Sequence, residues 1–282
     1  MVTTTPQIRD EIYFQENDSW RGYVSVIIPI YNEADSVDQL LRAVVESPIL
    51  KQIVIVDDGS TDGTREKLAA LETTESLVVL FHEENLGKGT AIRTALRYSR
   101  GEYVLIQDSD LEYSPSDYPA LLEPLMNRES NVVYGVRNDC ARRSFFYLGS
   151  RLLTHLTNLL YGSHIHDEAT CYKAFRRTVL SNLRLECRRF EFCPEITAKL
   201  CRIGERICEV PISYSPRDKR RGKKIRWRDG WIAAWTLVRF RFENLERIST
   251  RHRYADFCFG LAPLRWRSRG NRLIGGVHPK SL

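Results

Sequence analysis

The regular alternation of short apolar runs with amphipathic stretches over the first 140 residues is the feature that most constrains the fold. Five runs are rich in Val and Ile and are bounded by polar turns, as β-strands are. They read "YVSVIIPI", "QIVIVDD", "LVVLFH", "YVLIQD" and "NVVYGV". Helical patterns separate them at residues 34–46, 62–71, 88–99 and 116–128. Apolar strands separated by helices predict βαβ units, in which helices cover both faces of a mostly parallel sheet.

The second half of the chain has a less regular pattern. Residues 144–161, 193–203 and 229–247 show helical periodicity, whereas 169–177 and 206–214 read as extended segments. Pro211 lies in the last of these and predicts an edge strand, because proline cannot donate a hydrogen bond to a neighbouring strand.

These patterns predict a single α/β domain over residues 23–247. We expect its two parts to be residues 23–140 and 141–247. Residues 1–22 form an N-terminal extension, and residues 248–282 show no clear period, which is typical of a loosely ordered, basic tail.

The composition is that of an ordinary globular protein, with 43% apolar and 28% charged residues. No window approaches the roughly 18 apolar residues that a membrane-spanning helix needs, and the first residues lack the apolar core of a secretion signal. The seven cysteines are odd in number and include no CxxC pair. This argues against a disulfide framework or a zinc ribbon and favours free thiols in a cytoplasmic protein.

Polar clusters follow the first three predicted strands, at the edge where α/β sheets bind ligands. They read "PIYNE", "VDDGSTDGT" and "HEENLGKGTAIRTAL". Gly59 and Gly63 permit tight turns and Ser60 and Asp62 suit helix caps, so a purely structural role is one interpretation of the second cluster. Lys88 lies between two glycines where a helix begins, so its ammonium and the backbone N–H groups could face an anion.

The fourth predicted strand ends in "LIQDSDLEYSP", which places Asp108, Asp110 and Glu112 on alternate positions. Three close carboxylates repel one another unless water or a cation screens them. Mg²⁺ and Mn²⁺ prefer carboxylate oxygens and often bridge to substrate phosphates. A solvated acidic loop is the alternative for this cluster taken alone. Four polar clusters at one sheet edge together predict a site for a nucleoside-diphosphate ligand.

The motifs resemble those of glycosyltransferase family 2, and most of all its branch of dolichyl- or polyprenyl-phosphate sugar transferases. The residues that carry the resemblance are "VSVIIPIYNE", "VIVDDGSTDGT", "NLGKGTAIRTAL" and "QDSDLEYSPSDYPALL", followed more thinly by "DEATCYKAFRR", "FEFCPEITAKL" and "VPISYSPRDKRRGKKIRWRDG". The resemblance implies a GT-A fold, which is a Rossmann-like, mostly parallel sheet flanked by helices. It also implies transfer of a sugar from a UDP- or GDP-sugar to a polyprenyl phosphate, with inversion and with Mg²⁺ or Mn²⁺.

The same resemblance implies roles for individual residues. Pro29, Tyr31, Glu33 and Asp58 would hold the nucleoside, Asp108 would lie near the ribose or sugar, Asp110 and Glu112 would bind the metal, and Arg137, Arg217 and Lys223 would face donor or acceptor phosphates.

The acceptor decides whether a general base is needed. A phosphate is already ionised at neutral pH, whereas a hydroxyl on a glycan, lipid or metabolite must lose a proton. Glu195 in "FCPEI" is the candidate base for a hydroxyl acceptor, although a glutamate beside Pro194 is also an ordinary helix-start residue. Asp167 and Glu168 compete for this role.

Residues 217–228 read "RDKRRGKKIRWR" and carry eight basic residues among twelve. Such a cluster usually meets phosphate, and a solvated loop is the alternative. With the tryptophan- and arginine-rich residues 229–247 it predicts contact with an anionic membrane surface, unless that helix simply packs on the sheet. RNA binding is disfavoured because no strand aromatics for base stacking accompany the run, and we expect no nucleic-acid partner. A non-catalytic nucleotide-sugar sensor is disfavoured by the intact DxD motif.

Overall fold

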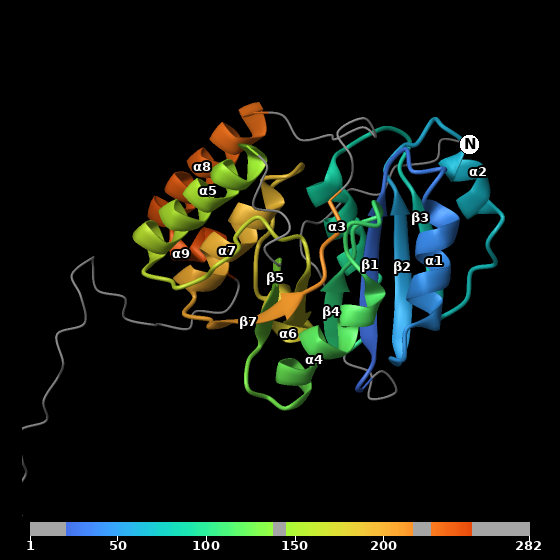
Figure 1. Ribbon diagram of the computed structural model, residues 1–282, viewed down its shortest axis with the longest axis horizontal. Helices are drawn as coiled ribbons and strands as arrows, with labels where there is room; N and C mark the ends of the chain where they lie inside the picture. The colour runs from blue at the N-terminus through green and yellow to red at the C-terminus, as the bar shows by residue number, and fades with distance from the viewer. Residues whose placement is uncertain (1–20, 138–144, 217–226, 250–282) are drawn as a thin grey trace, which may run out of the picture.

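The computed structural model describes residues 21–137, 145–216 and 227–249. Their strands form one seven-stranded sheet in the order β3-β2-β1-β4-β6-β5-β7, flanked by helices (Figure 1). The strands are β1 (Val24–Ile30), β2 (Lys51–Asp57), β3 (Leu77–Phe81), β4 (Tyr103–Ile106), β5 (Val132–Arg137), β6 (Lys173–Arg176) and β7 (Ile207–Ile212). β6 pairs antiparallel with β4 and β5, and the other pairs are parallel.

The helices lie between these strands largely where the sequence predicts them. They are α1 (Val37–Glu46), α2 (Thr64–Ala69), α3 (Lys88–Leu96), a 3₁₀ turn (Pro115–Asp117), α4 (Tyr118–Met126), α5 (Phe145–Tyr161), α6 (Arg177–Ser181), α7 (Phe192–Arg202), α8 (Trp227–Phe242) and α9 (Leu245–Ile248). The predicted mostly parallel α/β sheet is therefore confirmed. Pro211 lies in β7, which is an edge strand as expected.

Two predicted elements differ from the structure. Within the predicted extended segment 169–177, only Lys173–Arg176 form a strand (β6), and the short helix α6 begins directly after it at Arg177. The helix expected over 229–247 is divided after Phe242, where Asn244 caps α9 by accepting a hydrogen bond from the backbone N–H of Glu246 at 3.1 Å. A side-chain cap of this kind starts a new helix because it satisfies an N–H that would otherwise lack a partner.

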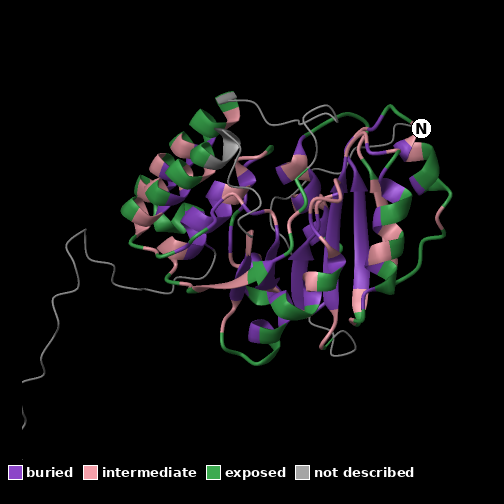
Figure 2. Cartoon of the chain, in the orientation of Figure 1, coloured by how far each residue is buried: buried purple, intermediate pink, exposed green. Residues whose placement is uncertain are grey.

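Two apolar cores cover the two faces of the sheet. Alternate residues of β1 point to opposite faces, so Val26 and Ile28 pack with α1 and α4, whereas Ile27 packs with α3 and α7. The central strands are buried along their whole length (Figure 2). Burial on both faces explains why these strands read as continuous apolar runs.

A third core lies beyond β5 and β7, where α5, α7 and α8 pack together (Figure 1). Leu237 and Phe240 of α8 are buried against Ala198 of α7. Arg202 of α7 donates to the backbone oxygen atoms of Phe240 and Arg241 at 2.6 and 2.7 Å, at the C-terminal end of α8. Within the described ranges, no helix is both long and apolar enough to cross a membrane.

Candidate active site

The loops after β1 and β2 are bonded to each other. The backbone N–H of Asn32 donates to Ser60 Oγ at 2.9 Å, and the N–H of Thr61 donates back to Asn32 Oδ1 at 2.8 Å. Gly59 adopts φ of +75° in this turn, and an added Cβ would meet the backbone of residue 84 at 2.5 Å. Gly59 thus forms the tight turn that the turn-and-cap interpretation of "DDGSTDGT" expects. Ser60 is not a helix cap: it joins the loop after β1, whereas Gly63 precedes α2 without a side-chain cap.

Asp58 is buried and holds the turn that precedes α3. Its carboxylate accepts from the N–H groups of Leu86 and Gly87 at 3.0 and 2.8 Å, and it lies 2.7 Å from Nδ1 of His82. Gly87 has φ of +95°. In the structure Asp58 therefore positions the Gly-Lys-Gly turn, which places Lys88 at the start of α3.

Lys88 reaches across the sheet edge to the end of β4. Its Nζ pairs with Asp108 and lies 3.1 Å from Sγ of Cys171. Burial disfavours the charged ammonium, but the neighbouring Asp108 carboxylate and the sulfur atoms of Cys171 and Cys193 together raise the pKa of Lys88 well above its usual value. One positive charge thus stays fixed beside the first carboxylate of the DxD motif.

The remaining carboxylates of the motif lie within the same turn. Leu111 between them adopts φ of +60°, which is an uncommon conformation for a bulky residue and is typical of functional sites. Asp110 Oδ1 accepts from the backbone N–H of Glu112 at 3.2 Å. Burial, followed by the charges of Asp108 and Glu112, raises the pKa of Asp110 to about 7. Burial and two neighbouring carboxylates both disfavour the charged form of Asp110, and a bound cation would favour it.

The carboxylates of this turn suit a divalent metal ion whose remaining ligands come from the substrate. In the described part of the chain, no three His, Cys, Asp or Glu side chains already form a metal-binding group. Asp110 and Glu112 could supply two hard carboxylate ligands, and Mg²⁺ in particular is commonly held by one or two carboxylates together with substrate phosphates. These residues suit a metal that arrives with a diphosphate.

The loop that follows β1 is linked to this turn through Ser36. Glu33 is buried, and its Oε2 accepts from Ser36 Oγ at 2.8 Å. Ser36 Oγ also lies 3.2 Å from the backbone oxygen of Ser109. Pro29 is buried in β1, and Tyr31 is partly exposed in the loop that follows. Glu33 and the DxD turn therefore belong to one cluster, which Ser36 joins, although nothing in the sequence pattern pointed to Ser36.

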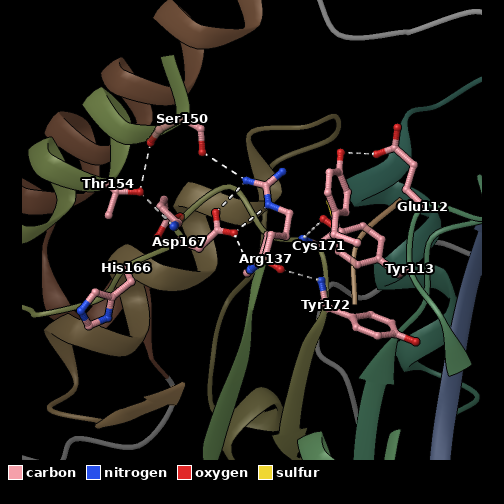
Figure 3. Close-up of polar contacts among 12 residues, drawn as sticks. Glu112, Tyr113, Arg137, Ser150, Thr154, His166, Asp167, Cys171 and Tyr172 are labelled. Carbon is pink, nitrogen blue, oxygen red and sulfur yellow. Dashed lines mark hydrogen bonds and ion pairs between the residues drawn. The ribbon is translucent and has the colours of Figure 1, made fainter. Parts of the chain in front are cut away.

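Arg137 lies at the end of β5 and is held by Asp167 (Figure 3). Its Nε and one terminal nitrogen each donate to the Asp167 carboxylate at 2.7 Å, and that terminal nitrogen also donates to Ser150 Oγ at 3.2 Å. The guanidinium lies 5.2 Å from the centre of the Tyr214 ring, whose hydroxyl donates to Glu112 Oε2 at 2.7 Å. The structure thus brings Arg137 next to the acidic turn through a residue that sequence reasoning missed. An aromatic residue two positions after a strand carries no distinctive signal.

Two of the three candidate bases, Glu195 and Asp167, are occupied by internal contacts. Glu195 is fully buried, accepts from the N–H groups of Glu186 and Cys187 at 2.7 and 2.9 Å, and pairs with Lys199 at 2.6 Å. Asp167 forms the ion pair with Arg137. Glu168 is also fully buried, and burial raises its pKa to about 8. Arg217 and Lys223 lie outside the described residues, so their roles stay predictions.

Comparison with known proteins shows which family the sequence resembles. The Glycosyl transferase family 2 model matches residues 25–184. The undecaprenyl-phosphate 4-deoxy-4-formamido-L-arabinose transferase of Edwardsiella ictaluri is 31% identical over 71% of this chain and 62% of its own. The dodecaprenyl-phosphate galacturonate synthase of Rhizobium johnstonii is 27% identical over 69% of this chain and 60% of its own. The chain thus spans about 60% of the length of these relatives.

Solved structures share the fold. Glucosyl-3-phosphoglycerate synthase from Mycobacterium tuberculosis, in complex with Mn²⁺, UDP-glucose and phosphoglyceric acid, superposes with a TM-score of 0.60. It is 22% identical, and the match covers 77% of this chain and 79% of that one. This likeness shows the GT-A fold that the sequence motifs predict. Since the family model covers more than half of the sequence and the sugar transferase of E. ictaluri exceeds 30% identity, the chain belongs to glycosyltransferase family 2.

Proposed function

We propose that this protein moves a sugar from a UDP- or GDP-sugar to a polyprenyl phosphate, using Mg²⁺ or Mn²⁺. The observation that carries the proposal is that an acidic turn and a partly buried arginine lie next to each other at one edge of the sheet. The carboxylates Asp110 and Glu112 would face a metal and diphosphate, and Tyr214 contacts both Glu112 and Arg137, which Asp167 holds. The names of the relatives, which act on undecaprenyl and dodecaprenyl phosphates, support the choice of acceptor.

On the donor side, Asp110 and Glu112 would hold the metal. When bound, the metal neutralises charge on the departing nucleoside diphosphate. Lys88 keeps its ammonium beside Asp108 and adds a second positive group at the same place. Pro29, Tyr31 and Glu33 would line the nucleoside, with Asp58 holding the adjoining turn.

On the acceptor side, a phosphate oxygen forms a bond to the anomeric carbon as the bond to the diphosphate breaks. The electron pair leaves with the diphosphate, and the configuration at that carbon inverts. Two anions must approach each other, so cations are needed more than a base. Arg137 supplies one such cation, and Arg217 and Lys223 would supply others.

The burial of Glu195 supports a phosphate acceptor over a hydroxyl acceptor. A general base must reach the proton that it removes. Both oxygens of Glu195 instead accept hydrogen bonds from the backbone and from Lys199, and the side chain is 0% exposed. A mechanism that needs no base is consistent with this arrangement.

We also propose that α5 and α8 rest on an anionic membrane surface on its cytoplasmic side. Large apolar side chains are exposed on these two helices: Leu148, Leu152, Leu159, Trp231, Ile232, Trp235 and Phe242. Trp231 and Trp235 point outward as the sequence suggested, whereas Leu237 and Phe240 pack inward on α7. The cysteines in the described residues are free thiols, which is consistent with a reducing compartment.

Liposome binding tests the membrane contact. Sedimentation with vesicles that contain anionic lipid is expected at low salt, and the Trp231→Ser/Trp235→Ser variant should lose most of it. Wild-type protein that stays in the supernatant with such vesicles would refute this contact.

A donor panel tests the reaction itself. Purified protein is incubated with Mn²⁺ or Mg²⁺, each UDP- and GDP-sugar, and polyprenyl phosphate, and released nucleoside diphosphate is measured. We expect release from one donor only when the lipid phosphate is present, and loss of that release in Asp110→Ala. Release that needs a hydroxyl compound instead of the lipid would replace the proposed acceptor. Donor binding without turnover on any acceptor would indicate a nucleotide-sugar sensor.

A further inference from the structure

Tyr214 is the residue through which the acidic turn and Arg137 meet. It lies two positions after β7 and forms an antiparallel bridge with Tyr113. The next residue, Ser215, donates its backbone N–H to the backbone oxygen of Glu112 at 2.9 Å. The backbone on which Tyr214 sits is therefore fastened to the segment that carries a candidate metal ligand.

The side chain of Tyr214 makes two further contacts. Its hydroxyl donates to Glu112 Oε2 at 2.7 Å, a short bond of the kind that a charged acceptor makes. The face of its ring lies under the guanidinium of Arg137 at 5.2 Å, within the range of a cation–π interaction. The ring also packs on that of Tyr113, with centroids 5.3 Å apart, so its orientation is fixed from a second side.

The partners of Tyr214 are themselves held. Asp167 holds Arg137 with two hydrogen bonds of 2.7 Å (Figure 3), and the guanidinium also lies over the Tyr214 ring. The backbone N–H of Asp167 in turn donates to Glu209 Oε1 of β7 at 3.2 Å. Asp167, Ser150 and Tyr214 together fix the direction of the Arg137 guanidinium.

Resting on the function proposed above, we propose that Tyr214 is a positioning residue for both substrates. Its hydroxyl turns the Glu112 carboxylate toward the metal, and its ring holds Arg137 toward the acceptor phosphate. Groups that hydrogen-bond to a metal ligand without touching the metal typically change metal affinity about 10- to 100-fold when they are removed. Two separable effects are therefore expected, one from the hydroxyl and one from the ring.

The first test removes the hydroxyl and keeps the ring. In Tyr214→Phe we expect Mn²⁺ affinity, measured by electron paramagnetic resonance with UDP or GDP present, to fall about tenfold. The KM for polyprenyl phosphate should stay near the wild-type value. Tyr113→Phe is the matched control, because its hydroxyl accepts from the N–H of Cys171 and makes no bond to Glu112, so its Mn²⁺ affinity should be unchanged. A Tyr214→Phe protein that binds Mn²⁺ as the wild type does would overturn the inference.

A double variant checks that the effect passes through Glu112. In Glu112→Gln, further removal of the Tyr214 hydroxyl should weaken Mn²⁺ binding by less than twofold, since the charged acceptor is gone. If the two substitutions instead lower Mn²⁺ affinity by the product of their separate effects, Tyr214 acts independently of Glu112 and the link is overturned.

The ring is tested with Tyr214→Leu. This variant should raise the KM for polyprenyl phosphate about tenfold above that of Tyr214→Phe, and an unchanged KM would refute the role toward Arg137. Thermal unfolding of each variant shows whether it is folded, and Tyr214→Phe by itself decides the metal part. The two proposals can fail separately. Wild-type protein that binds Mn²⁺ but uses no lipid phosphate would refute the proposed function alone. Wild-type turnover with lipid phosphate, together with an unchanged Mn²⁺ affinity in Tyr214→Phe, would refute only the role of Tyr214.

Discussion

Replacing Glu195 with glutamine separates a structural role from a catalytic one. The carboxylate of Glu195 is 0% exposed and receives three hydrogen bonds, from Glu186 N, Cys187 N and Lys199 Nζ. An amide at this place keeps one acceptor oxygen, but its NH₂ group faces a donor and leaves the Lys199 ammonium without a counter-charge. Lys199 is only 1% exposed, so water cannot replace the lost partner.

The expected loss of stability follows from these contacts. Breaking a buried ion pair by removing one partner costs about 3–5 kcal/mol. Lys199 also donates to the backbone oxygen of Arg184 and lies 4.2 Å from the Phe240 ring centre, which moderates the loss. We therefore expect a decrease of about 3 kcal/mol, which lowers the melting temperature of a domain of this size by about 6–12 °C.

Urea unfolding and kinetics together test this reasoning. Glu195→Gln should lower the urea midpoint, whereas Glu195→Gln/Lys199→Met should recover much of the loss because it removes both charges at once. At a temperature where the variant is folded, kcat with polyprenyl phosphate should stay within a fewfold of wild type. A fully stable variant whose kcat falls by about 10²–10⁴-fold would refute the structural reading and identify Glu195 as a base.

Three further predictions follow from the buried charges. Lys88→Met should weaken UDP or GDP binding in the presence of Mn²⁺ by about 10- to 100-fold in calorimetry, because hydrogen bonds to charged groups contribute about 1.5–3 kcal/mol; equal affinity would contradict its role. The hydrogen bond from Cys171 lowers the pKa of Cys193 to about 6, so mass spectrometry should find iodoacetamide labelling of Cys193 rising as pH increases through about 6; no labelling until pH 8 or above would argue against it. Burial raises the pKa of Glu168 to about 8 in the folded protein, above the value of about 4.3 expected when unfolded, so the folded state binds the extra proton and its stability falls as pH rises between these values. Glu168→Gln should remove this fall, and urea curves at pH 5, 6, 7 and 8 that keep a constant difference from wild type would contradict the assignment.

The strands and most helices could be predicted from local pattern alone. A strand buried on both faces needs apolar residues at nearly every position, and β1 and β2 show this in their sequence. The edge of the sheet that carries the site could also be predicted, because the polar residues of a parallel sheet gather where its strands end. Glycines with positive φ, such as Gly59 and Gly87, marked turns that no other residue adopts easily.

What the sequence by itself determined is therefore the fold class, the family motifs and the edge of the sheet that carries the acidic residues. Only the tertiary structure decided which of those residues act together. It showed that Glu195 is paired with Lys199, that β6 runs antiparallel, and that Tyr214 joins Glu112 to Arg137. The physical reason is that secondary structure follows a local period, whereas these pairings join residues as many as 102 positions apart and depend on how whole elements pack.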